Sequence, residues 1–173
     1  GLPFSEELEG EDLVKKIKSL SELFGNDKTN VLLYHGELLD SFFSAEDFGG
    51  EGEKRYMPVH LSAFKGTGVD YVLAGHFHSN SDVWKIDDSS YFVYPGSPVS
   101  ITRRETGVRH AVLIEDGNPP RNIPLYTSHY REVNVEIDPL ENKDPLEKIS
   151  EALEQAEENE NVLLSVSGYI AGE

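Results

Sequence analysis

Two short apolar segments, each ending in histidine beside glycine, constrain the fold of this chain most strongly. They are "NVLLYHG" at residues 30–36 and "DYVLAGHFH" at residues 70–78. Each apolar run spans only four or five residues, which favours a buried strand over a helix. In open α/β sheets, ligands gather outside the carboxyl ends of the strands. We therefore expect the two histidine-bearing ends to point to one edge of a sheet.

The first half of the chain alternates helices with strands. An amphipathic stripe predicts a helix over residues 11–27, with Gly25-Asn26 as its stop. The apolar positions of this stripe are Leu13, Ile17, Leu20 and Phe24. A second helix is expected within residues 58–67. The loop before it, residues 41–57, is rich in glycine, charge and aromatic residues and is long enough to be functional.

The second half of the chain is richer in strands. A hairpin is predicted over residues 82–97, a strand and turn over 109–127, and a half-buried strand over 130–138. A helix is predicted over residues 144–160 and a last strand over 161–170. The start of that helix carries a capping box and a proline at its first position: Asp144, Pro145 and Glu147. The whole pattern predicts an α/β fold with an antiparallel edge or second sheet.

Charge and composition limit the class of protein. The chain of 173 residues has no cysteine, which excludes disulfides, a thiolate zinc site and a thiol nucleophile, and fits a cytoplasmic protein. No apolar run approaches the roughly 20 residues that span a bilayer. The net charge of −17 argues against nucleic-acid binding by the surface as a whole. Residues 96–131 differ, because five arginines stand against three acids there, 5 − 3 = +2.

The three histidines at the strand ends are candidate metal ligands. In extended backbone His76 and His78 would face the same side, about 6.5 Å apart at about 3.3 Å per residue. Two imidazoles so placed can share one ion or reach two ions roughly 3.5–4 Å apart, and the spacing leaves both arrangements open. His35 stands in the same context on the other strand. The remaining histidines lack that context and are expected to be structural: His60, His110 and His129.

These segments resemble a known superfamily. "NVLLYHGEL", then after about forty residues "DYVLAGHFH", and then "YPGSP" are similar to the C-terminal half of a calcineurin-like metallophosphoesterase domain. The likeness is greatest to the SbcD-type DNA double-strand-break repair nucleases, for which the "PGSP" turn is typical. The resemblance implies part of a metallophosphoesterase sandwich over residues 1–131 and the beginning of a small α+β capping domain over 132–173. It also implies that the chain is an excised part of a longer nuclease.

The resemblance further implies a ligand set. His35 and His76 would bind one divalent, manganese-type ion, and His78 would bind the neighbouring ion. The other ligands and the catalytic histidine of the family come from Asp-x-His, Gly-Asp and Gly-Asn-His motifs, which are absent from this sequence. We therefore expect both ions to be lost from, or weakly bound to, this chain by itself. No catalytic residue is expected in it.

The resemblance also implies partners. The whole enzyme would be a hydrolase acting as an exonuclease or endonuclease in DNA repair and recombination. It would be a homodimer that binds DNA and a coiled-coil ATPase of the SbcC type, with no membrane involved. Three arginines after the "PGSP" turn are candidate contacts for the phosphate backbone, with an ordinary charged strand and loop as the alternative: Arg103, Arg104 and Arg109.

Two other functions stay open from the sequence. One is a metallophosphoesterase acting on a small phosphodiester or a phosphoprotein. The other is a non-catalytic module whose histidines are vestigial. A capping domain after residue 130 distinguishes the nuclease from small phosphodiesterases. The three earlier ligand motifs distinguish an enzyme of either kind from a non-catalytic module.

Overall fold

The structure is a computed structural model that describes residues 10–41, 56–79, 81–115, 118–141 and 143–169. Within these ranges the chain is mixed α/β, with two α-helices, short 3₁₀ turns and small sheets. The general α/β class expected from the sequence agrees with this arrangement. Three aromatic residues of the loop that was expected to be functional lie outside the described residues: Phe42, Phe43 and Phe48.

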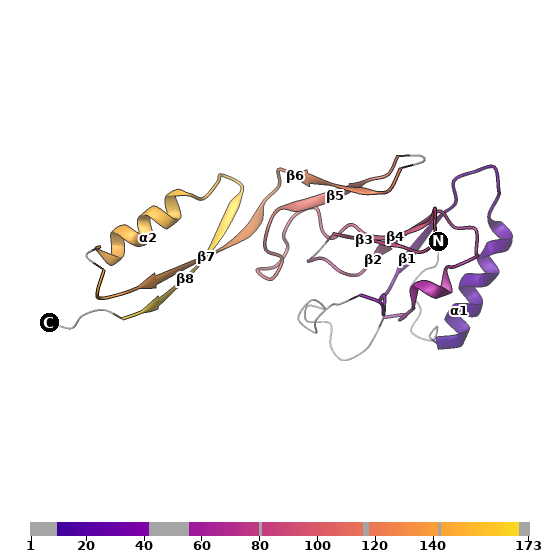
Figure 1. The fold of residues 1–173 in the computed structure, drawn as a ribbon, viewed down its shortest axis with the longest axis horizontal. Helices are drawn as coiled ribbons and strands as arrows, with labels where there is room; N and C mark the ends of the chain where they lie inside the picture. The colour runs from indigo at the N-terminus through magenta and orange to yellow at the C-terminus, as the bar shows by residue number, and fades with distance from the viewer. Residues whose placement is uncertain (1–9, 42–55, 80, 116–117, 142, 170–173) are drawn as a thin grey trace.

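A four-stranded mixed sheet forms the centre of the larger part of the molecule (Figure 1). Its strands, in spatial order, are β1 (Val31–His35), β2 (Tyr71–Gly75), β4 (Tyr91–Tyr94) and β3 (Asp82–Lys85). β1, β2 and β4 run parallel, and β3 is antiparallel to β4, as the predicted hairpin requires. Because β1 and β2 are parallel neighbours, their carboxyl ends lie at the same edge of the sheet.

One face of this sheet carries the main hydrophobic core. The helix α1 (Gly10–Ser19) contributes Leu13 and Ile17, which are fully buried. On β1, Leu32 is 3 % exposed whereas its neighbour Leu33 is 58 % exposed. Such alternation with a period of two marks a strand with one buried face. β1 is thus half-buried rather than fully buried as expected, because the face that carries Leu33 is exposed.

The first predicted helix ends earlier than its apolar stripe. α1 stops at Ser19, and the next four residues form the 3₁₀ turn η1 (Leu20–Leu23). Phe24 then adopts extended backbone, although its side chain still packs against the core. The stripe therefore identified residues that lie in the core or pack against it. Its first two positions are on the α-helix, whereas Leu20 lies in the 3₁₀ turn and Phe24 directly after it.

The second predicted helix is wrong. Residues 58–67 contain only the 3₁₀ turn η3 (Leu61–Ala63). Val59 is drawn into a parallel β-bridge with Leu38, which requires extended backbone just where the helix would begin. Gly66 has a φ of +71°, which ends any helical continuation.

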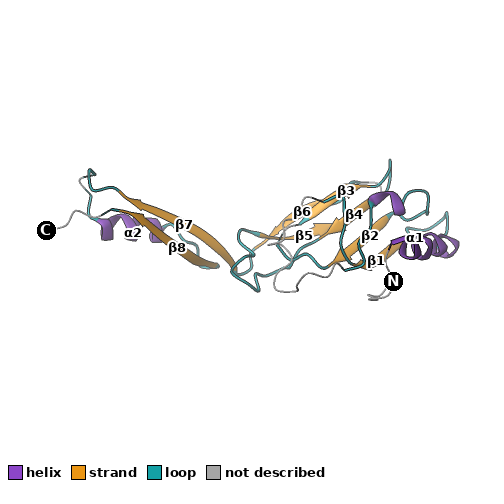
Figure 2. Ribbon diagram, turned by 90° about the horizontal axis from the view of Figure 1, so that it is seen from below, coloured by secondary structure: helices purple, strands orange, loops and turns teal. Residues whose placement is uncertain are grey.

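A second pair of strands and a βαβ unit follow the main sheet. β5 (Arg109–Leu113) and β6 (Arg121–Leu125) pair antiparallel, and hydrogen bonds between Ser81 and Asn122 join this pair to the start of β3. β7 (His129–Ile137), α2 (Pro145–Glu154) and β8 (Glu160–Gly168) then form a unit whose two strands are parallel. Figure 2 shows this unit extending from one end of the molecule.

The βαβ unit has its own small core. Val133, Val135 and Ile137 of β7 pack against Ile149 and Ala152 of α2. The carboxylate of Asp144 accepts a hydrogen bond from the Leu146 N–H at 2.7 Å, which confirms the predicted N-cap. α2 ends at Glu154, six residues before the predicted end. Within the described part of the chain, the helices are too short and too polar to cross a membrane.

The alternation along β1 yields a stability test. We expect Leu32→Ala to lower the free energy of unfolding by about 2–5 kcal/mol, because it opens a cavity under the sheet. Leu33→Ala, its exposed neighbour, should change it by only about 0.5 kcal/mol. Urea unfolding of the 173-residue chain followed by circular dichroism measures both. Equal losses would show that β1 does not have one buried face.

Candidate functional site

The rings of His35 and His76 lie together at the carboxyl ends of β1 and β2. The parallel register aligns His35 with Gly75, so that His76 follows directly beside it. The two ring centroids are 5.7 Å apart, in an edge-on arrangement of 73°. A Cβ added to Gly75 would stand 3.0 Å from His35 Nδ1. The missing side chain of Gly75 therefore provides the space that the His35 ring occupies.

His76 adopts an unusual backbone conformation. Its φ is +126°, a region that residues with a side chain rarely enter. Val72 and Ala74 point into the core, so continued extended backbone would send His76 into the core as well. Instead Phe77 is buried in the core and His76 is half-buried outside it. The backbone at His76 thus reverses the alternation and delivers the imidazole to the sheet edge.

Aromatic rings hold His76 in that position. Its ring lies 4.8 Å from the ring of Tyr56 and 4.9 Å from the ring of Phe77, measured between centroids. Phe77 in turn packs edge-on against Tyr94 at 5.0 Å. Tyr56 is fixed by its own backbone, whose N–H donates to the carboxylate of Glu37 at 2.8 Å and whose carbonyl accepts from the Glu37 N–H at 2.8 Å.

Two buried tyrosines support the segments below the histidines. Tyr34 donates its hydroxyl hydrogen to the carbonyl of Met57, and Tyr94 donates to the carbonyl of Gly36. Burial raises the pKa of both hydroxyl groups, Tyr34 and Tyr94, above the ordinary tyrosine value. Both remain neutral donors at physiological pH. The first bond connects β1 to the segment that carries Tyr56, and the second connects β4 to the residue after β1.

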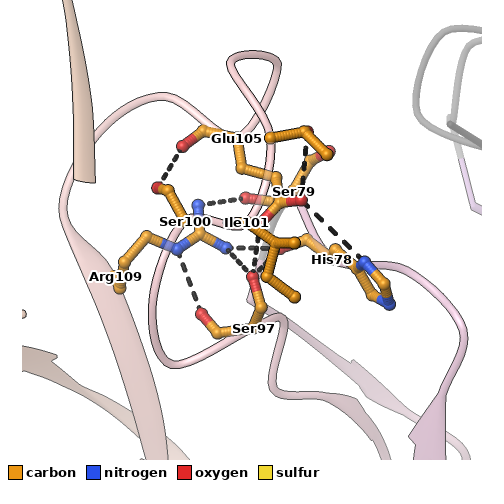
Figure 3. A network of polar contacts seen from close by, with 8 residues as sticks. His78, Ser79, Ser97, Ser100, Ile101, Glu105 and Arg109 are labelled. Atoms are coloured by element: carbon orange, nitrogen blue, oxygen red, sulfur yellow. Dashed lines mark hydrogen bonds and ion pairs between the residues drawn. The ribbon is translucent and has the colours of Figure 1, made fainter. Parts of the chain in front are cut away.

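His78 lies apart from this pair in its contacts. Its side chain is 56 % exposed, and its Nδ1 lies 3.9 Å from a carboxylate oxygen of Glu105 (Figure 3). The strand ends at Gly75, so the extended-backbone spacing used for His76 and His78 does not apply. Over the residues that the structure describes, no three histidine, aspartate or glutamate side chains form a group that could hold a metal ion.

Among the described residues, the two imidazoles of His35 and His76 are the candidate ligands that lie side by side. His35 and His76 are placed so that they could share one ion, because imidazole nitrogen is a common ligand of divalent transition metals. Two neutral ligands leave most of a coordination sphere to other groups. His78 could serve a separate position beside Glu105.

The arginines after the "PGSP" turn divide into two kinds. Arg103 and Arg104 are exposed in a turn immediately before Glu105, which contacts His78. Arg109 is instead 3 % exposed and donates hydrogen bonds to the backbone carbonyls of His78, Ser79 and Ser97. For Arg109 these contacts agree with the structural alternative to a phosphate contact, because its guanidinium donates to backbone carbonyls within the fold.

Glu105 is a residue of the site that the sequence did not indicate. Burial by itself would raise its pKa, but hydrogen bonds from the Ile101 N–H and the hydroxyls of Ser97 and Thr102 hold the pKa below the ordinary value. It is 3 % exposed and ionised at physiological pH. Burial lowers the pKa of Arg109, and the charge of Glu105 opposes that effect. One acid among several arginines was the only sequence signal.

Two of the three histidines expected to be structural contact neighbouring carboxylates or backbone carbonyls. His60 Nδ1 lies 3.2 Å from Asp40, and the exposed pair sits at the start of η3. His129 is buried, with Nδ1 3.1 Å from the carbonyl of Thr127 and Nε2 3.6 Å from Glu160. His110 lies within β5, opposite Pro124.

Comparison with known proteins adds no family assignment. No protein-family model matches the chain, and no curated protein matches it. The residues and their geometry therefore carry the functional argument.

The space at Gly75 yields a second test. We expect Gly75→Ala to shift the NMR signals of the His35 ring while lowering the free energy of unfolding by less than about 1 kcal/mol, because an exposed ring can move aside. Gly36→Ala is the contrast. Its Cβ would stand 2.7 Å from the backbone oxygen of Tyr56, so we expect a loss of about 1–3 kcal/mol. Unchanged His35 signals in Gly75→Ala would contradict the packing described.

Proposed function

We propose that this chain carries the histidine-bearing part of the metal centre of a two-metal, calcineurin-like phosphodiesterase, a DNA repair nuclease of the SbcD type. The observation that supports it most is the pairing of His35 and His76 at the ends of two parallel strands. The strained backbone of His76 adds to it, because strain of this kind clusters at functional sites.

The chemistry of the proposal follows from the ligand type. Two divalent ions, when bound, polarise a phosphodiester and supply hydroxide for in-line displacement. The residues of this chain have narrower tasks. His35 and His76 would bind one ion, Gly75 leaves room for the His35 ring, and Tyr56 and Phe77 keep the His76 imidazole at the sheet edge.

The proposed substrate is DNA. Arg103 and Arg104 are exposed beside the loop residue that contacts His78, so a phosphate near His78 would be within the field of both guanidinium groups. The resemblance of "DYVLAGHFH" and "YPGSP" to the nuclease branch supports an SbcC-type ATPase as partner, a homodimeric enzyme and a cytoplasmic location. The β7–α2–β8 unit follows the main sheet in chain order, and we propose that it is the beginning of the capping domain.

The ligand count limits what this chain does by itself. Neutral imidazoles do not offset the roughly four positive charges of two dications, and the motifs that supply aspartates in the family are absent from this sequence. We therefore expect this chain to bind divalent metal at a specific position but weakly, and not to hydrolyse phosphodiesters by itself.

We expect Mn²⁺ added to the metal-free 173-residue chain to broaden the NMR signals of His35 and His76 before those of other residues. His35→Ala and His76→Ala should each remove this selective effect. His110→Ala, a histidine change on β5, is the control and should leave it in place.

Two outcomes would contradict the proposal in different ways. Broadening that spreads over the acidic surface without preference for His35 and His76 would remove the metal site. Measurable hydrolysis of bis-p-nitrophenyl phosphate by this chain with Mn²⁺ would refute the claim that further ligands are required.

The arginine assignment has its own test. In the full-length protein, we expect Arg103→Ala and Arg104→Ala each to weaken binding to a DNA duplex and to reduce the slope of log affinity against log salt by about 1, because each removes one phosphate contact. Arg121→Ala, an exposed arginine of β6 paired with Glu115, is the matched control. Fluorescence anisotropy over a salt series measures the slope. An unchanged slope in both variants would exclude the two arginines.

A further inference from the structure

Two buried charged residues that the proposed metal pairing does not use lie close together, one in the loop between β4 and β5 and the other at the start of β5. Glu105 and Arg109 are each 3 % exposed. A charged side chain this deeply buried is costly unless hydrogen bonds satisfy it. Both are satisfied, and their partners converge on the segment that carries His78 (Figure 3).

Arg109 fixes the backbone on both sides of the network. Its Nη2 donates to the carbonyl of His78, its Nη1 donates to the carbonyl of Ser79 at 3.0 Å, and its Nε donates to the carbonyl of Ser97 at 3.0 Å. The Ser97 N–H also donates to the carbonyl of His78, at 3.1 Å. The planar guanidinium thus holds the segment at 78–79 against the "PGSP" turn with several bonds of fixed geometry.

Hydrogen bonds also fix the carboxylate of Glu105. One carboxylate oxygen accepts from the Ser97 hydroxyl at 2.7 Å and from the Ile101 N–H at 3.0 Å, and the other accepts from the Thr102 hydroxyl at 3.1 Å. Ser97 Oγ also lies 3.2 Å from the carbonyl of His78. A hydroxyl has one hydrogen to donate, and the shorter, charged partner Glu105 takes it.

The ring of His78 stands at the outer side of this network. Its Nδ1 faces Glu105 at 3.9 Å, a distance for electrostatic attraction or a bridging water rather than a direct hydrogen bond. Figure 3 shows the second ring nitrogen turned away from the network, and the side chain is 56 % exposed. A fixed carboxylate on one side of an imidazole favours the tautomer with its hydrogen on that side.

We infer that Glu105 and Arg109 are positioning residues for His78: Arg109 fixes its backbone, and Glu105 keeps the hydrogen on Nδ1 so that the Nε2 lone pair faces outward to bind a divalent cation. That the ligand is a cation rests on the proposed function. A histidine that binds metal usually donates its other ring N–H to a carboxylate or carbonyl, and loss of such a partner weakens binding by 10–100-fold. Glu105 supplies such a carboxylate, 3.9 Å from the Nδ1 of His78.

The test is the tautomer of His78 in the metal-free chain, read from the ¹⁵N chemical shifts of its ring at a pH where the imidazole is neutral. We expect the Nδ1–H form to dominate in the unmodified chain and to lose its dominance in Glu105→Gln, which keeps the shape but not the charge. Ser100→Ala is the matched control. Ser100 donates to the backbone carbonyl of Glu105, so this variant perturbs the same loop and leaves the carboxylate in place.

A Zn²⁺ titration followed at the His78 signals gives the second readout. We expect Glu105→Gln to weaken the response by about 10-fold or more and Ser100→Ala to leave it unchanged. Arg109→Lys keeps the positive charge but removes the planar guanidinium with its several N–H donors. We expect it to increase hydrogen exchange of the backbone near Ser79. This third variant keeps the inference testable if Glu105→Gln fails to fold.

The outcomes separate this inference from the proposed function. The same His78 tautomer in the unmodified chain and in Glu105→Gln would overturn the role of Glu105, whatever the metal does. Unchanged exchange in Arg109→Lys would overturn the role of Arg109. Absence of any metal response at His35 and His76, with the tautomer still dependent on Glu105, would refute the proposed function and leave the orientation of His78 intact.

Discussion

The parallel pairing of β1 with β2 determines where the candidate ligands lie. Its register aligns His35 with Gly75, and Gly75 leaves the space that the His35 ring fills. The next residue, His76, then meets that ring at 5.7 Å. A shift of the pairing by one residue would place a different side chain opposite Gly75, and it would turn alternate residues of β1 to the wrong face. Leu32 and Tyr34, buried on the core side, oppose such a shift.

The strain at His76 is compensated by the residue that follows it. A side-chain-bearing residue at positive φ costs on the order of 1–3 kcal/mol. The same conformation turns Phe77 into the core, where burial of an aromatic side chain contributes about 1.5–3 kcal/mol. The two magnitudes are similar, so the local structure can be held by ordinary packing. The imidazole reaches the edge of the sheet because its neighbour is buried.

The sequence predicted what depends on local pattern. The apolar runs gave both strands that end at histidine, alternation gave β7, and Asp144 gave the start of α2. The sequence did not predict local structure that depends on contacts with residues far away in the chain. Residues 58–67 do not form the predicted helix, because Val59 pairs with Leu38 in a β-bridge. The pattern of a single segment does not reveal such a pairing.

The candidate site shows the same division. The histidines were found because strand ends have a recognisable pattern. The sequence left the role of Arg109 open, because an arginine that donates to backbone carbonyls looks the same in sequence as one that faces solvent. Glu105 was missed because its partners lie in three separate places in the chain, at His78, Ser97 and the turn before it.

The loop that carries Glu105 also connects the site to the βαβ unit. Thr106 forms a β-bridge with Tyr130, and the Gly107 N–H donates to the carbonyl of Tyr130 at 2.8 Å. The chain from residue 132 to 160 has eleven acids and two lysines, 2 − 11 = −9, so an incoming polyanion meets repulsion from that unit. Charges beyond about 8–10 Å are largely screened at physiological salt. The exposed Arg103 and Arg104, which precede Glu105, would therefore outweigh the more distant acids for an anion bound close to His78. A loop tied at one side to His78 and at the other to β7 places these opposing charges on either side of one junction.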